Sequence, residues 1–275
     1  PGTKPDTVAE VLGGHRPWLD AQLVQHGAVL FRNVGVREAL DFERLAKAVT
    51  QKLENNYLGT SPRDAVTEYV FNASELPNFY PIPQHCEMSF VKEPPKRLLF
   101  CCLVAPESEG GETPLCDFRA VLRDLDPGVR ERFEKYGVRI VRNYSGPDGK
   151  APAGPWQLKP WHQLFGTTDR DRIEEVCREN EFDFTWLPGG RLRLVHSQPA
   201  TRVHPVTGEV AWFNHSQVFH PSQAPGELRR IARRQDRARM TALSWVASGL
   251  VALQRRTKDA EDLAMNCTYG DGTPI

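Results

Sequence analysis

The segment QHCEMSF (84–90) places an imidazole and a carboxylate two positions apart, at His85 and Glu87. If this segment is a strand, both side chains project from the same face and can reach one metal ion together. A second, distant histidine would complete a facial set of two histidines and one carboxylate. That set suits iron(II) and leaves positions open for a co-substrate and oxygen. An H-x-E pair alone is a weak signal, because chance produces it often.

Other histidines later in the chain could supply the missing donor. His204, His215 and His220 all lie at a plausible distance along the sequence. A zinc-dependent hydrolase that uses His85, Glu87 and His215 is therefore an alternative to an iron enzyme. The six cysteines include no C-x-x-C pair, so the sequence does not predict a structural zinc site.

The spacing of apolar residues predicts the elements that must position these side chains. Helical periodicity predicts helices over 7–26, 38–51, 119–125, 128–136, 170–180 and 225–256, with Gly27 as a stop and Asp117 as a cap. Short apolar or alternating runs predict strands over 28–34, 68–71, 98–105, 113–116, 138–143, 192–195, 200–204 and 210–214. The segment 145–168 is rich in Gly, Pro and Trp and is typical of a long functional loop.

This order of elements constrains the fold. Strands and helices do not alternate regularly, which argues against a doubly wound parallel sheet. Many short strands, with helices at the N-terminus and in insertions, predict a mainly β fold with flanking helices, a sandwich or jelly roll. We expect one domain over residues 1–275, with a helical N-terminus and a helical insertion near 225–256.

Charge and hydropathy indicate which kinds of partner and which cellular compartment to expect. Lys plus Arg and Asp plus Glu are both 35, so no net charge points to nucleic acid as a partner. The chain has no long apolar run and no N-terminal apolar signal region, so we expect no membrane association. Cys101 and Cys102 are adjacent in the apolar run RLLFCCLVA, which predicts a buried strand with reduced thiols and favours the cytoplasm. The basic run 229–239 (RRIARRQDRAR) is either a solvated helix face or a docking surface for an acidic partner or an anionic substrate.

Several motifs occur in one order along the chain. They are QHCEMSF (84–90), an apolar run over 98–105, GGETPLCD (110–117), HPVTGEVAWFNHSQVFH (204–220) and NCTYGDGTPI (266–275), preceded by HGAVLFR (26–32). In this order the chain resembles the taurine dioxygenase-like family of iron(II)/2-oxoglutarate-dependent oxygenases. It is most similar to the branch of amino-acid hydroxylases from peptide natural-product pathways. The resemblance implies a double-stranded β-helix, or jelly roll.

The resemblance also implies roles for single residues. It makes His85 and Glu87 metal ligands, and it makes Thr113 a hydrogen-bond donor to 2-oxoglutarate, although a strand threonine can equally pack by its methyl group. Gly110 and Gly111 are expected to be turn residues that need positive φ. Phe213 and Asn214 lie where the family lines its substrate pocket.

The family's second iron histidine and its 2-oxoglutarate arginine follow the YGDGTPI turn by some tens of residues. Both are therefore expected beyond Ile275, together with the last strands of the jelly roll. If the protein lacks them altogether, it would be a catalytically inactive, oxygenase-like binding protein.

The activity that the resemblance implies is hydroxylation of an unactivated carbon, coupled to conversion of 2-oxoglutarate and O2 to succinate. Glu87 occupies the ligand position where a halogenating relative binds chloride, so hydroxylation, desaturation or epoxidation is favoured over halogenation. The expected substrate is an amino acid, either free or attached to a peptide or a carrier protein.

Overall fold

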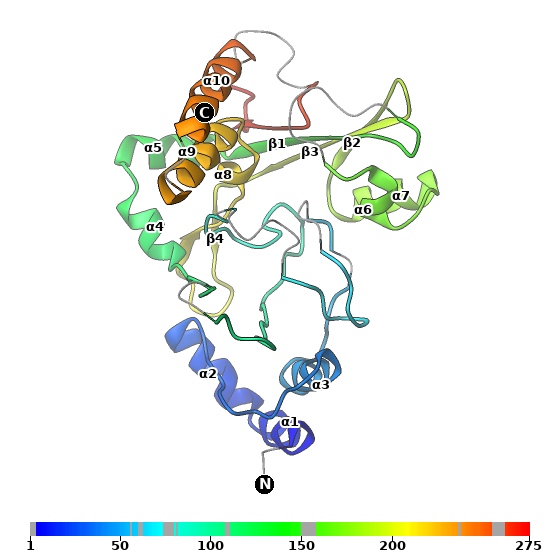
Figure 1. Ribbon diagram of the computed structural model, residues 1–275, viewed down its shortest axis with the longest axis vertical. Helices are drawn as coiled ribbons and strands as arrows, with labels where there is room; N and C mark the ends of the chain where they lie inside the picture. Colours follow the sequence, from blue (N-terminus) through cyan, green and yellow to red (C-terminus); the bar gives the residue numbers. More distant parts are fainter. Residues whose placement is uncertain are drawn as a thin grey trace.

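An antiparallel sheet lies at the centre of the computed structural model, which describes residues 4–55, 57–59, 63–73, 80, 82–107, 111–149, 158–235, 238–254 and 262–275. Its four strands run in the order β2-β3-β1-β6 (Figure 1). They are β1 (Val138–Tyr144), β2 (Asp183–Leu187), β3 (Arg191–Gln198) and β6 (Met265–Tyr269). A separate hairpin is formed by β4 (Thr201–Val203) and β5 (Val210–Trp212).

The central strand β1 organises the main hydrophobic core. Val138, Ile140 and Tyr144 alternate along it and are completely buried. Leu192 and Leu194 of the neighbouring β3 are buried in the same cluster. Burying alternate side chains on one face is what a strand geometry with period two allows.

Helices flank both ends of the sheet. The helices that follow residue 117 are α4 (Phe118–Asp124), α5 (Pro127–Tyr136), α6 (Trp161–Phe165), α7 (Arg170–Glu179), α8 (Ser216–Phe219), α9 (Gln223–Gln235) and α10 (Ala238–Gln254). In Figure 1, α6 and α7 lie near one end of the sheet, and α8, α9 and α10 lie near the other. None of the described helices is both long enough and apolar enough to cross a membrane.

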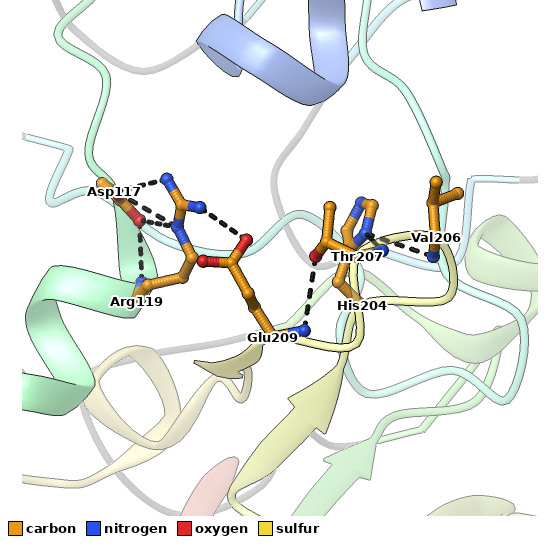
Figure 2. A network of polar contacts seen from close by, with 6 residues as sticks. All are labelled: Asp117, Arg119, His204, Val206, Thr207 and Glu209. Carbon is orange, nitrogen blue, oxygen red and sulfur yellow. Dashed lines mark hydrogen bonds and ion pairs between the residues drawn. The ribbon is translucent and has the colours of Figure 1, made fainter. Parts of the chain in front are cut away.

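A polar network holds the β4–β5 hairpin against α4 (Figure 2). Arg119 pairs with Asp117 at 2.9 Å and with Glu209 at 2.7 Å. Asp117 is also the N-cap of α4, because its side chain accepts a hydrogen bond from the Arg119 amide. The turn of the hairpin is closed by His204 Nδ1, which accepts hydrogen bonds from the amides of Val206 and Thr207.

Three N-terminal helices make a second, smaller cluster. They are α1 (Pro5–Gly14), α2 (Arg16–His26) and α3 (Ala39–Val49), and they lie at the opposite end of the long axis from α10 in Figure 1. Their buried residues are Leu12, Leu19, Leu45 and Val49. Arg16 Nε donates to the Ala48 carbonyl at 2.6 Å and ties the start of α2 to the end of α3.

Most of the predicted helices are confirmed. The helix predicted over 7–26 is two helices, α1 and α2, which meet at His15, and Gly27 ends α2 with φ 76° as expected. The helix predicted over 225–256 is the pair α9 and α10. The structure also has strands β2 and β6 and helices α6 and α8, which the sequence did not predict.

Four predicted strands are wrong. Residues 28–34, 98–105 and 113–116 form no strand, and 68–71 contributes only the isolated bridge Ala65↔Phe71. The clearest error is the segment 98–105, which was expected to be buried. Its side chains Leu98, Phe100, Leu103 and Val104 are exposed, as are Cys101 and Cys102. All six cysteines of the chain are free thiols, as expected, although three of them are at the surface.

The described residues therefore contain antiparallel sheets and helices, with more helix than the expectation of a mainly β fold implied. The physical reason is that a strand needs a partner for its backbone groups, and apolarity alone does not supply one. The helical N-terminus and the helical segment near 225–256 are both present.

Candidate metal centre

His85 and Glu87 lie at the start of a tight turn and not on a strand. Residues 82–86 belong to no helix or strand, and 87–90 form the turn. The Ser89 amide donates to the Cys86 carbonyl at 3.2 Å, and Met88 has φ 50°. A positive φ at a non-glycine residue is uncommon and directs the chain sharply. The expected strand geometry is wrong, but the turn brings the two side chains together: His85 Nε2 is 3.5 Å from Glu87 Oε2.

The orientation of the His85 ring is fixed from behind. Its Nδ1 donates a hydrogen bond to the Pro83 carbonyl at 2.9 Å. Because a carbonyl can only accept, Nδ1 carries the hydrogen and Nε2 points toward Glu87. Metal-binding histidines commonly use one ring nitrogen in this way and leave the other for the metal. The hydrogen bond to Glu87 raises the pKa of His85, while burial opposes that rise.

The Glu87 carboxylate is kept ionised although it is largely buried. Burial opposes ionisation, but the hydrogen bond with His85 and the positive charge of Arg63 outweigh it and lower the pKa of Glu87 to about 2. Arg63 Nη2 donates to Glu87 Oε2 at 2.9 Å, and its guanidinium lies 4.6 Å from the Tyr57 ring centre. The carboxylate is thus charged and held in one orientation, which a ligand for a cation needs.

His215 supports the pair from the buried side. Its ring centre is 5.2 Å from that of His85 and 5.4 Å from that of Phe90. Its Nδ1 is hydrogen-bonded to the Ser89 hydroxyl at 2.8 Å. Burial, followed by the nearby His85, lowers the pKa of His215 to about 3, so its ring is neutral.

The other two candidate histidines lie elsewhere. His204 closes the β4–β5 turn, and His220 Nδ1 contacts the Ser222 hydroxyl at 2.6 Å at the end of α8. Within the described ranges, no three His, Cys, Asp or Glu side chains form a group that could hold a metal. His85 and Glu87 are therefore a pair, with His215 packed beside them and not added to them as a third ligand.

The remaining predicted site residues are spread over two regions. Thr113 is exposed and belongs to no helix or strand. Gly111 has φ 85° as expected of a turn glycine, while Gly110 lies outside the described residues. Asn214 is completely buried: its amide donates to the Ala200 carbonyl at 2.8 Å and accepts from the Ser216 amide at 3.0 Å. Phe213 lies under the Arg202 guanidinium, 5.4 Å from its ring centre. The roles of Thr113, Phe213 and Asn214 toward ligands remain predictions.

Sequence reasoning missed two contributors to this centre. Arg63 lies 24 residues before Glu87 in a region that no motif marks, so only the fold reveals it. Ser89 belongs to the QHCEMSF motif, but its partner His215 is 126 residues away. Ser89 lies in the QHCEMSF motif and His215 lies in the run FNHS (213–216), but neither motif indicates that the two residues are in contact.

Comparison with known proteins identifies the family of this chain. Residues 2–252 match the family described as taurine catabolism dioxygenase TauD, TfdA family. The chain is 30% identical to the dapdiamide synthesis protein DdaC of Enterobacter agglomerans, over 75% of this chain and 59% of that protein. It is 32% identical to a clavaminate synthase-like protein of Arabidopsis thaliana, over 72% of this chain and 60% of that protein.

A shorter match covers 24% of this chain and 26% of the 3-((Z)-2-isocyanoethenyl)-1H-indole synthase of Fischerella ambigua, at 36% identity. The chain spans about 60% of the length of the first two relatives. Because the family match covers residues 2–252, most of the chain, this chain belongs to the TauD/TfdA dioxygenase family.

Proposed function

We propose that the protein is an iron(II)/2-oxoglutarate-dependent oxygenase that hydroxylates an unactivated carbon of an amino acid or an amino-acid-derived compound. The observation that supports this most directly is the His85–Glu87 pair, an imidazole nitrogen and an ionised carboxylate oxygen 3.5 Å apart. Membership of a dioxygenase family and similarity to a dapdiamide synthesis protein support the reaction class and a role in specialised metabolism.

The donor chemistry fits a ferrous ion. Imidazole and carboxylate are two of the three ligand types of the non-haem iron(II) facial set. Glu87 is charged, and the His85 nitrogen that faces it is the one not used by Pro83. The family resemblance implies a histidine as the third donor and an arginine for 2-oxoglutarate, and the His85–Glu87 pair supplies the other two donors.

Each neighbouring residue would then have a defined task. His85 and Glu87 would hold the iron, which with 2-oxoglutarate and O2 supplies the oxidising power for hydroxylation. Arg63 holds the Glu87 carboxylate in place, and Pro83 fixes the His85 tautomer. The neutral, buried His215 and Phe90 keep water from the inner side of the pair. Thr113 is proposed to bind 2-oxoglutarate, and Phe213 and Asn214 to line the substrate pocket.

The test is iron-dependent conversion of 2-oxoglutarate to succinate by the whole protein, with candidate amino acids offered free, as peptides or bound to a carrier protein. We expect succinate formation that needs both Fe(II) and O2 and that rises with the correct substrate.

Thr113→Val should raise the concentration of 2-oxoglutarate required for half-maximal turnover. Activity with zinc that is insensitive to O2 would support a hydrolase instead. The absence of turnover, with ligand binding retained, would support an inactive binding protein.

A further inference from the structure

Helix α10 exposes an apolar stripe. Leu243, Val246, Leu250 and Leu253 are between 48% and 61% exposed, and they are spaced three, four and three residues apart. This spacing puts them on one side of the helix, where they form a continuous apolar row. Trp245, which is 71% exposed, lies on the adjoining side. A row of large apolar side chains in contact with water typically marks an interaction site.

Another side of α10 packs against the protein itself. Ser244 is completely buried, and Met240, Ala247 and Val251 are partly buried on the side that packs against α9. Figure 1 shows the two helices side by side, at the end of the molecule away from α1. The helix is therefore apolar on two sides, and only one of them has a partner among the described residues.

Positive charge gathers at one end of this stripe. Arg233 and Arg234 are in the last turn of α9, and Arg239 is in the first turn of α10. All three are exposed, and none forms an ion pair with any residue that the structure describes. In contrast, Arg230 in the same helix pairs with the buried Glu227. The positive charges of the three arginines can therefore pair with carboxylates of another molecule.

We propose that the α9–α10 face, made of the Leu243–Leu253 stripe and the arginines 233, 234 and 239, is the docking surface for an acidic helical protein domain. A stripe with three- and four-residue spacing is complementary to a second helix that carries its own apolar seam. Unpaired arginines at one end select a partner with carboxylates at the matching position. The inference concerns binding only and does not rest on the proposed function.

Two other occupants fit the surface less well. A helix that lies on a lipid surface carries cations along its length, but α10 has one charged residue, at its N-terminal end. A second copy of the chain would bring the same arginines and, in a parallel pairing, would repel the first.

The test uses a synthetic helical peptide with leucine at both seam positions of each heptad and glutamate elsewhere, titrated by calorimetry into the protein. The matched probe is the same peptide with lysine in place of glutamate. We expect the glutamate peptide to bind at least about tenfold more tightly than the lysine peptide, with the difference reduced by salt.

Two variants locate the binding. Arg233→Gln/Arg234→Gln/Arg239→Gln and Val246→Gln/Leu250→Gln should each weaken binding about tenfold. The matched controls, Arg123→Gln/Arg172→Gln/Arg178→Gln and Val129→Gln/Val206→Gln, change exposed residues elsewhere and should leave it unchanged. Circular dichroism checks that each variant folds.

The proposal is overturned if neither peptide binds, if both bind equally, or if the control variants weaken binding as much as the surface variants do. It is also overturned if the protein instead floats with phosphatidylglycerol vesicles. A dimer in sedimentation that Val246→Gln/Leu250→Gln dissociates would assign the stripe to self-association.

Discussion

The two proposed metal ligands depend on each other for their protonation and orientation. His85 Nε2 and Glu87 Oε2 face one another, and each shifts the pKa of the other toward its charged form. A divalent cation would replace this contact with two metal–ligand bonds. The pair is therefore prepared for a cation by groups that lie outside the pair, Arg63 and the Pro83 carbonyl.

Removing either ligand should remove metal binding. His85→Ala and Glu87→Ala each delete one donor of a small set, so we expect Co(II), used as a stable substitute for Fe(II), to bind too weakly to measure by calorimetry. His204→Ala is the control, because that histidine closes a surface turn far along the chain. Co(II) affinity that survived both substitutions would remove these residues from the metal site.

The Arg119 network gives a prediction about surface carboxylates. Its guanidinium lowers the pKa of Glu209, and it lowers the pKa of Asp117 to about 2, in both cases chiefly through hydrogen bonds. Both carboxyls have a lower pKa in the folded protein than in the unfolded chain. Their stabilising effect is therefore complete above about pH 4 and is lost as the pH falls toward 2.

Arg119→Met should raise the pKa of Asp117 and Glu209 toward about 4, which carbon-13 NMR of the side-chain carboxyls can follow. Arg130→Met, which removes a different surface pair with Glu134, should leave both unchanged. If the pKa of Asp117 does not move in Arg119→Met, the helix N-cap and not the arginine sets it.

At the scale of elements, a comparison of two glycines distinguishes the cost of backbone strain from the cost of a steric clash. Gly137 joins α5 to β1 with φ 67°, and an added Cβ would meet the Gln198 carbonyl oxygen at 2.5 Å. Gly189, between β2 and β3, has φ 77°, and nothing lies within 4 Å of an added Cβ. Both positions strain an L-residue, but only the first also meets backbone.

Gly189→Ala should therefore lower the free energy of unfolding by about 1 to 2 kcal/mol, the cost of a left-handed residue with a Cβ. Gly137→Ala should lower it by more, because the clash with a backbone carbonyl adds to the same strain. Urea denaturation followed by circular dichroism measures both. Equal losses would mean that the chain around Gly137 shifts without cost.

Elements with their own local signals could be predicted from the sequence. Asp117 as a cap identified the start of α4, and Gly27 as a stop identified the end of α2. The alternation of apolar residues identified the central strand β1. The error at 98–105 has a different origin. Apolar residues show that a segment favours burial, but whether it is buried depends on partners that are distant in sequence.

The same distinction applies to the site. The two-residue spacing of His85 and Glu87 identified the pair, although a turn and not a strand brings it together. The sequence offered His215 as a candidate third donor, but it gave no sign of the contact between His215 and Ser89, which crosses 126 residues. Arg63 could not be predicted, because its contact with Glu87 crosses 24 residues and leaves no periodic signal.

At the scale of the whole molecule, the segment 98–104 matters most for behaviour in solution. It forms no helix or strand, bends at Leu103 and Val104, and makes no backbone hydrogen bond to any other described segment. Phe100 and Val104 are 61% and 86% exposed. An exposed apolar segment whose backbone groups have no partner in the described part of the chain can pair with a strand of another molecule.

Phe100→Lys/Val104→Lys in the chain of residues 1–275 should therefore reduce concentration-dependent association, as measured by light scattering, because charges on an edge oppose strand pairing. Val206→Lys/Val210→Lys, at the β4–β5 hairpin, is the matched control for added charge. If the control reduces association equally, net charge and not the unpaired segment is responsible.

Cys86 makes the turn itself observable. The residue lies between the two proposed ligands, its sulfur contacts the Trp212 carbonyl oxygen at 3.6 Å, and burial raises its pKa to about 12. Alkylating reagents attack thiolates, so the Cys86 thiol should be unreactive while the turn is folded as described. The surface thiols Cys101, Cys102 and Cys116 are accessible to the reagent. The alkylation rate of Cys86 therefore reports how often the turn opens. A cation that bridges His85 and Glu87 should lower that rate.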